Sequence, residues 1–167
     1  MNMNIKTPVM NPTNHLKIFY LFTLTLLLSL MFFINPVFAA NGVNVDSNGL
    51  AIKGYDPVAY FTMSKPVKGK KEFTVDYKGN KWALSSDAHK QAFLANPEAY
   101  LPQYGGFCAF AASKNSIAKT DPEAWTIHNN KLYLNYSKSV RSIWVKDKPG
   151  NIVKADGYWP ELMKQVP

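Results

Sequence analysis

The chain has 167 residues, of which 47% are hydrophobic and 14% aromatic, a composition typical of a folded protein and not of a disordered one. Its single cysteine excludes an internal disulfide framework and any metal site built from several cysteines of one copy. The 19 Lys and Arg residues against 11 Asp and Glu give a formal net charge of +8, which is compatible with an anionic partner.

The first 39 residues have the order of a secretory signal. Two lysines precede an uncharged apolar run at residues 18–34, and Val37 and Ala39 are small residues placed as signal peptidase requires. We therefore predict a signal peptide at residues 1–39, a domain at 40–167, and Sec export to the periplasm or the extracellular space. The apolar run also approaches the length of a membrane-spanning helix, so an uncleaved membrane anchor stays open as the alternative.

Export changes the meaning of the positive charge. Removing the two lysines of residues 1–39 lowers the formal net charge from +8 to +6. The one dense basic run, residues 65–71, contains Gly and Pro and has no interleaved aromatic residues, so we interpret it as a solvated hairpin tip. We expect no nucleic-acid partner, and no stable membrane span unless the signal stays uncleaved.

The first half of the predicted domain is rich in strand patterns. A short strand at residues 50–52 continues at 58–61 after a break that contains Gly and Pro. Apolar and polar residues alternate at 73–77, and a turn at 78–80 leads to a returning strand at 82–84. This order predicts a β-hairpin.

Helical signals follow the hairpin. Ser85, Ser86 and Asp87 supply cap oxygens and an acidic first turn, which predict a helix over residues 87–95. His89 lies on its apolar face, one turn before Phe93. A proline-started turn at 97–99 and a small-residue helix within 107–112 come next, separated by Gly105 and Gly106.

The last third predicts a second hairpin and helices. A turn at residues 121–123 precedes a strand at 125–127, and two asparagines connect it to a strand at 131–136. Ser137 caps a helix that the Pro-Gly pair at 149–150 ends, and an amphipathic turn follows before Pro160. Strands mixed with short helices, without a βαβ alternation, predict an α+β fold in one small domain.

Cys108 and His89 are the candidate functional side chains. Cys108 follows two glycines and is expected in the first turn of a helix, where free N–H groups favour a thiolate; the alternative is a small buried hydrophobic residue. His89 offers an imidazole ligand, although a histidine satisfied by a backbone carbonyl fits its position equally well. Asp56 lies in a Pro-containing turn, and we interpret it as an Asx-type turn residue.

Common enzyme motifs are missing from the sequence. It lacks the signatures of serine hydrolases, zincins, P-loop and dinucleotide-binding proteins, and c-type haem proteins. A nucleophile–base pair of Cys108 and His89 stays open as a thiol-dependent enzyme or redox protein.

Several ordered motifs together resemble the YHS-domain family, and its secreted bacterial members in particular. They lie at residues 54–61 (GYDPVAYF), 82–93 (WALSSDAHKQAF), 96–100, 102–109 (PQYGGFCA), 131–136 and 159–160. Cysteine-rich YHS modules are related to TRASH-type metal-binding domains and occur in heavy-metal and copper handling. The resemblance therefore implies a metal-binding role.

This chain departs from the cysteine pattern of such modules. Where they have a cysteine after Asp-Pro-Val and a C-x-x-x-C at the helix start, this sequence has Ala59, Ser85 and His89. One possible ligand remains there, and Cys108 is added in the Tyr-Gly-Gly segment. Two ligands do not make a closed zinc site, whereas thiolate and imidazole suit Cu(I) at low coordination number.

The sequence thus predicts an exported, non-enzymatic YHS protein that binds or senses a soft metal ion, copper before zinc, through Cys108 and His89. Two alternatives stay open. One is the thiol-dependent enzyme described above, and the other is a small-ligand or protein-interaction module with a purely structural Cys108. The sequence does not indicate an oligomeric state.

Overall fold

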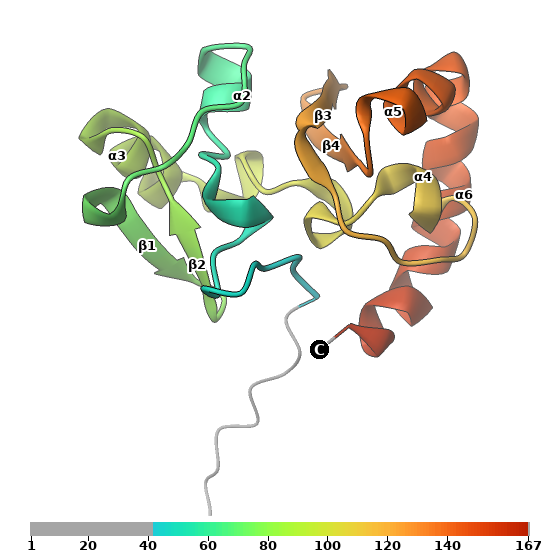
Figure 1. The fold of residues 1–167 in the computed structure, drawn as a ribbon, viewed down its shortest axis with the longest axis horizontal. Helices are drawn as coiled ribbons and strands as arrows, with labels where there is room; N and C mark the ends of the chain where they lie inside the picture. Colours follow the sequence, from blue (N-terminus) through green and yellow to red (C-terminus); the bar gives the residue numbers. More distant parts are fainter. Residues whose placement is uncertain (1–41, 167) are drawn as a thin grey trace, which may run out of the picture. The chain divides into compact units, whose positions relative to one another are not determined.

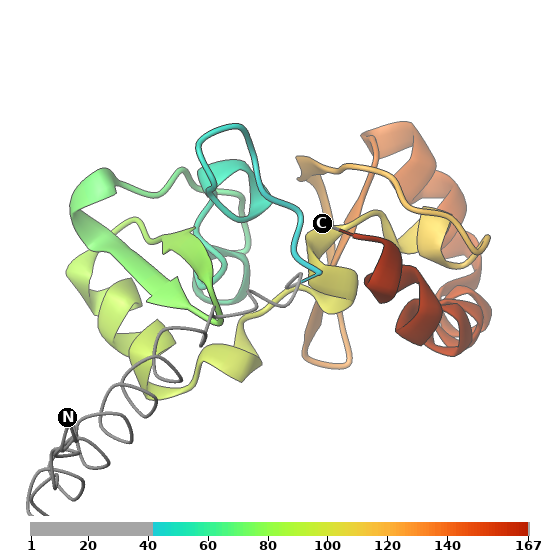
Figure 2. The same cartoon turned by 90° about the horizontal axis from the view of Figure 1, so that it is seen from below.

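A computed structural model of the chain describes residues 42–166, which all belong to one compact unit. The predicted signal segment at residues 1–39 lies outside the described residues. Within these residues, no helix has the length and apolar character needed to cross a membrane. Two antiparallel hairpins and short helices build this part of the chain (Figures 1 and 2), so the predicted α+β class is confirmed.

The first hairpin forms where the alternating pattern predicts it. Strands β1 (Thr74–Tyr77) and β2 (Asn80–Ala83) pair in antiparallel register. Lys78 and Gly79 join them with φ angles of 48° and 73°, as a tight two-residue turn requires. Helix α3 (Asp87–Ala95) follows over the predicted range.

The segment before this hairpin differs from the prediction. Ile52–Gly54 forms a 3₁₀ turn with left-handed φ angles, and residues 58–61, which we expected to be a strand, contribute instead to helix α2 (Ala59–Thr62). The cause is Asp56, whose Oδ1 accepts hydrogen bonds from the backbone N–H groups of Val58 and Ala59. These are the free donors at a helix start, so the turn develops into a helix.

The basic run at residues 65–71 is not a hairpin tip, which corrects the prediction. It connects α2 to β1 and hydrogen bonds to the segments beside it. The Val67 carbonyl accepts from the Asp56 N–H, Gly69 donates to the Gly54 carbonyl, and Lys70 donates to the Leu84 carbonyl. The backbone is thereby held in place while the lysine side chains remain exposed.

The second hairpin consists of β3 (Asp121–His128) and β4 (Lys131–Asn135). Asn129 and Asn130 make the predicted turn with φ angles of 49° and 58°. Residues 121–123 are the start of β3 and not a separate turn, and the pairing with β4 is irregular between Asp121 and Trp125. That irregularity explains why proline is tolerated at this strand start.

Three helices lie on one side of this hairpin: α4 (Ala109–Ala112), α5 (Lys138–Trp144) and α6 (Lys148–Leu162). Ser137 caps α5 as predicted. The Pro-Gly pair at 149–150, however, lies in the first turn of α6, and the expected short turn is a helix of 15 residues that contains Pro160. Proline in the first turn of a helix loses no intrahelical hydrogen bond, because the N–H group at that position has no partner within the helix. It can therefore start a helix as well as end one.

The remaining 3₁₀ segments are Lys71–Phe73, Pro97–Ala99, Gln103–Gly106, Val145–Asp147 and Met163–Gln165.

Strand β4 contributes to two hydrophobic clusters through its alternating side chains. Leu132 and Leu134 join a cluster with β1, β2, α2 and α3, in which Trp82 and Phe93 are buried. Tyr133 faces the other way, toward a cluster with α4, α5 and α6. Successive strand residues point to opposite faces, so one strand serves both clusters. His89 belongs to the first region and Cys108 to the second.

The Tyr-Gly-Gly segment of residues 104–106 connects these regions. A Cβ on Gly105 would lie 1.7 Å from the Gly42 carbonyl oxygen, and the Gly105 φ angle is +57°. The Gly105 carbonyl accepts from the Asn44 N–H at 2.8 Å. Glycine is required here because two backbone segments approach without room for a side chain.

Candidate functional site

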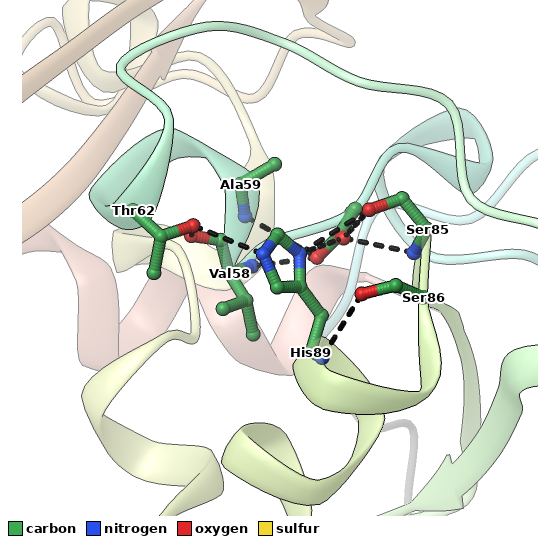
Figure 3. Close-up of polar contacts among 7 residues, drawn as sticks. Val58, Ala59, Thr62, Ser85, Ser86 and His89 are labelled. Atoms are coloured by element: carbon green, nitrogen blue, oxygen red, sulfur yellow. Dashed lines mark hydrogen bonds and ion pairs between the residues drawn. The ribbon is translucent and has the colours of Figure 1, made fainter.

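The carboxylate of Asp56 is the centre of the most connected polar network in the first half of the described chain. Its side chain is fully buried. Oδ1 accepts from Val58 N at 2.9 Å and Ala59 N at 3.3 Å, and Oδ2 accepts from Ser85 N at 2.8 Å and Ser85 Oγ at 2.6 Å. Figure 3 shows these donors gathered from the residues at the start of α2 and just before α3. A buried carboxylate with this many donors is satisfied without contact with water.

His89 is the fifth donor to this carboxylate. Its Nδ1 lies 2.5 Å from Asp56 Oδ2 and 3.2 Å from Ser85 Oγ, and 15% of its side chain is exposed. Because an ionised carboxylate only accepts hydrogen bonds, the geometry assigns a proton to Nδ1. The Ser86 side chain accepts from the His89 N–H and so positions the same residue at the start of α3. The ring therefore has a defined orientation.

The other ring nitrogen faces an exposed hydroxyl. His89 Nε2 lies 3.1 Å from Thr62 Oγ1 (Figure 3), which is also 3.1 Å from the Val58 carbonyl oxygen. The threonine has one hydroxyl hydrogen, which it donates either to Val58 or to Nε2. When it donates to Val58, the lone pair of Nε2 in the neutral ring is available to another partner.

The three positions that the resemblance assigns to family ligands converge in the structure. Ala59 and Ser85 donate to Asp56 through their backbone N–H groups, and His89 donates through its ring. Asp56 therefore occupies the place where these positions meet. Sequence reasoning interpreted it only as a turn residue, because its long-range partners are 29 and 33 positions away. Thr62 was missed altogether.

Cys108 has a different environment. It is the residue immediately before α4, at the N-cap, and not within the first helical turn as predicted. Its Sγ accepts from Ala111 N at 3.4 Å and Tyr136 N at 3.2 Å, and lies 3.9 Å from Asn135 Oδ1. Only 2% of the residue is exposed. The sulfur thus acts as a hydrogen-bond acceptor that joins the start of α4 to the end of β4.

Cys108 and His89 share no hydrogen-bond partner among residues 42–166. Their helices α4 and α3 lie on opposite sides of the β3–β4 hairpin in Figure 1. Over the same residues, no group of three or more His, Cys, Asp or Glu side chains is arranged to hold a metal ion. A metal ion shared by Cys108 and His89 stays a prediction that these contacts do not support.

A large cavity of about 820 Å³ lies elsewhere, lined by aromatic side chains that include Tyr77, Tyr104 and Trp159. Tyr104 donates to Asp156 Oδ1 at 2.9 Å. Burial, together with this hydrogen bond, raises the pKa of Tyr104 well above its ordinary value. A small-ligand or protein-interaction module would use an aromatic-lined cavity of this kind.

The fold and the polar network define a small α+β module whose Asp56–His89 network lies between α2 and α3. The family model of the YHS domain matches residues 58–104, a range that contains Thr62, Ser85 and His89. The chain therefore carries a YHS domain, which confirms the family predicted from its motifs. Extension of that domain over residues 40–167 stays a prediction. No curated protein and no solved structure matched the chain.

Proposed function

We propose that this protein is a non-enzymatic YHS module that binds one soft metal ion, Cu(I) before Zn(II), through Nε2 of His89. The observation that carries the proposal is the hydrogen bond from His89 Nδ1 to the buried Asp56 carboxylate. Metal-binding histidines commonly donate their second ring N–H to a carboxylate, which fixes the tautomer and makes the free nitrogen a better ligand.

The donor set favours an open site over a closed one. A structural zinc centre needs four protein ligands, and residues 42–166 hold no group of three suitable side chains. One imidazole beside the Thr62 hydroxyl fits an ion that keeps coordination positions for a ligand from outside the chain. An exchangeable ion of this kind suits binding or sensing better than structural stabilisation.

Cys108 has a structural role in this proposal. Two backbone N–H groups already use its sulfur, and it is buried. A thiol-dependent enzyme would need a base within hydrogen-bond reach of the sulfur, and the polar partners of Sγ are Asn135, Ala111 and Tyr136. These contacts give the enzyme alternative no support.

An anaerobic titration with Cu(I), in competition with a chromophoric chelator, tests the proposal on the purified protein. We expect His89→Gln to weaken Cu(I) binding by about tenfold or more, because it removes the one imidazole that Asp56 orients. His128→Gln is the matched control, because His128 ends β3 and is not among the residues that hydrogen bond to the Asp56 carboxylate. X-ray absorption of the loaded protein should show a nitrogen ligand that the His89→Gln variant lacks.

Cys108→Ser separates the two metal hypotheses. Unchanged affinity in this variant, with a loss in His89→Gln, supports the His89 site. A loss in both variants replaces it by the shared site that the sequence predicts. Equal affinity in His89→Gln and the unmodified protein overturns the proposal.

A further inference from the structure

Four lysines line a second cavity, of about 740 Å³, that is separate from the Asp56–His89 network. Lys53 comes from the 3₁₀ turn Ile52–Gly54, Lys68 and Lys71 from the basic run, and Lys81 from β2. The fold thus adds two distant cations to a run that looked in the sequence like an isolated solvated segment. We call this space, with its four lysines, the lysine cavity.

Within residues 42–166, no ion pair neutralises a lysine of the lysine cavity. The ion pairs that lysines make within residues 42–166 are Lys78–Glu98, Lys138–Glu123 and Lys164–Glu161, and none includes a lysine of the cavity. Two aspartates also line it. Asp46 directs Oδ1 to the N–H groups of Asn48 and Leu50, and Asp76 faces Lys81 across the hairpin without an ion pair. The positive charge therefore exceeds the negative charge at this cavity.

Lys68 is held in position instead of moving freely in solvent. Its Nζ donates to the Lys53 carbonyl oxygen at 2.6 Å and lies 4.5 Å from the centre of the Tyr55 ring. Both contacts restrict the side chain of this lysine. Thr74 and Asn48 also line this cavity, and their side chains carry neutral hydrogen-bond donors.

We propose that the lysine cavity binds a small ligand that carries several oxyanion groups, as a chain of phosphates does. The positively charged lysines around the cavity repel one another. An anion with more than one charged group offsets this repulsion at several lysines at once. Lysine is a compact point charge that suits phosphate-like oxygens without demanding a planar partner. The volume of about 740 Å³ leaves room for more than one phosphate group. This site is independent of the metal site at His89.

Calorimetric titration of the purified protein with tripolyphosphate tests the proposal. In low salt we expect saturable binding with one site, and about tenfold weaker binding by Lys68→Gln/Lys81→Gln, because the variant removes two of the four cations. Lys146→Gln/Lys154→Gln carries the same change of net charge away from the cavity and should bind like the unmodified protein. The lysines concerned are exposed, so both variants should keep the thermal midpoint of the unmodified protein.

Two further measurements make the result decisive. Amide chemical shifts should change at Gly54, Gly69 and Thr74 on addition of tripolyphosphate, and less on addition of inorganic phosphate at the same concentration. Equal loss of affinity in the two double variants would show attraction to net charge alone and overturn the proposal. So would the absence of binding in low salt, or shift changes confined to other segments.

Discussion

The regions around His89 and Cys108 treat a potential metal ligand in opposite ways. At His89 the buried Asp56 carboxylate takes the inner ring nitrogen, and the outer nitrogen faces the exposed Thr62 hydroxyl. At Cys108 the backbone amides of Ala111 and Tyr136 point at the sulfur itself, which is buried. The two residues therefore differ in accessibility. The fold leaves a ring nitrogen of His89 accessible to a metal ion and buries the sulfur of Cys108, although sulfur is the softer ligand.

Replacing the carboxylate should have the largest effect. We expect Asp56→Ala to lower the free energy of unfolding by about 3–5 kcal/mol, because it leaves several buried donors without an acceptor. Urea denaturation followed by tryptophan fluorescence measures the change. Asp46→Ala is the control, because Asp46 also accepts from two backbone N–H groups but is only half-buried. A similar loss in the two variants would show that the Asp56 network is an ordinary turn.

Removing the sulfur acceptor should have a smaller effect. Cys108→Ala leaves the N–H groups of Ala111 and Tyr136 without their acceptor, and we expect a loss of about 1–3 kcal/mol in the free energy of unfolding. Cys108→Ser keeps an acceptor atom and should lose less. Native Cys108 should react slowly with iodoacetamide, and rapidly once urea unfolds the chain. Fast labelling of the native protein would contradict the structural role assigned to this thiol.

Alkaline pH should reveal the buried tyrosines of both regions. Burial raises the pKa of Tyr60 in the first cluster and of Tyr104 in the second, well above the ordinary value near 10. The unfolded chain therefore releases these protons at lower pH than the folded chain does. The stability that the neutral tyrosines contribute is complete below about pH 10 and declines above it, by at most about 1.4 kcal/mol per pH unit for each tyrosine.

Phenylalanine variants identify the groups responsible for this alkaline loss. Tyr60→Phe and Tyr104→Phe should each reduce the slope of unfolding free energy against pH between pH 10 and 11.5. Tyr136→Phe, at an exposed position, should leave the slope unchanged. An unchanged slope in the first two variants would mean that other groups titrate on unfolding.

Local signals predicted several elements correctly. Helix α3 has the bounds expected from the Ser86 cap and the Asn-Pro pair, and both hairpins turn at the expected residues. A cap, a tight turn and an alternating pattern depend on residues only a few positions apart, so the sequence carries the whole signal.

The predictions were wrong where a local sequence pattern is compatible with two different secondary structures. Residues 58–61 have an apolar pattern that fits a strand, but Asp56 capped them as a helix. The Pro-Gly pair at 149–150 fits a helix end as well as a helix start, and Asp147 accepts from the Gly150 N–H to make it a start. Only the neighbouring contacts decide between such outcomes.

The sequence by itself determined the YHS domain, the α+β class and the candidate residues His89 and Cys108. Tertiary structure decided that these two have separate surroundings, that Asp56 meets His89 across 33 positions, and that Lys53 and Lys81 join the basic run. The physical reason is that hydrogen bonds and charges act through space. Their partners are set by packing around the two hydrophobic clusters, which no short stretch of sequence records.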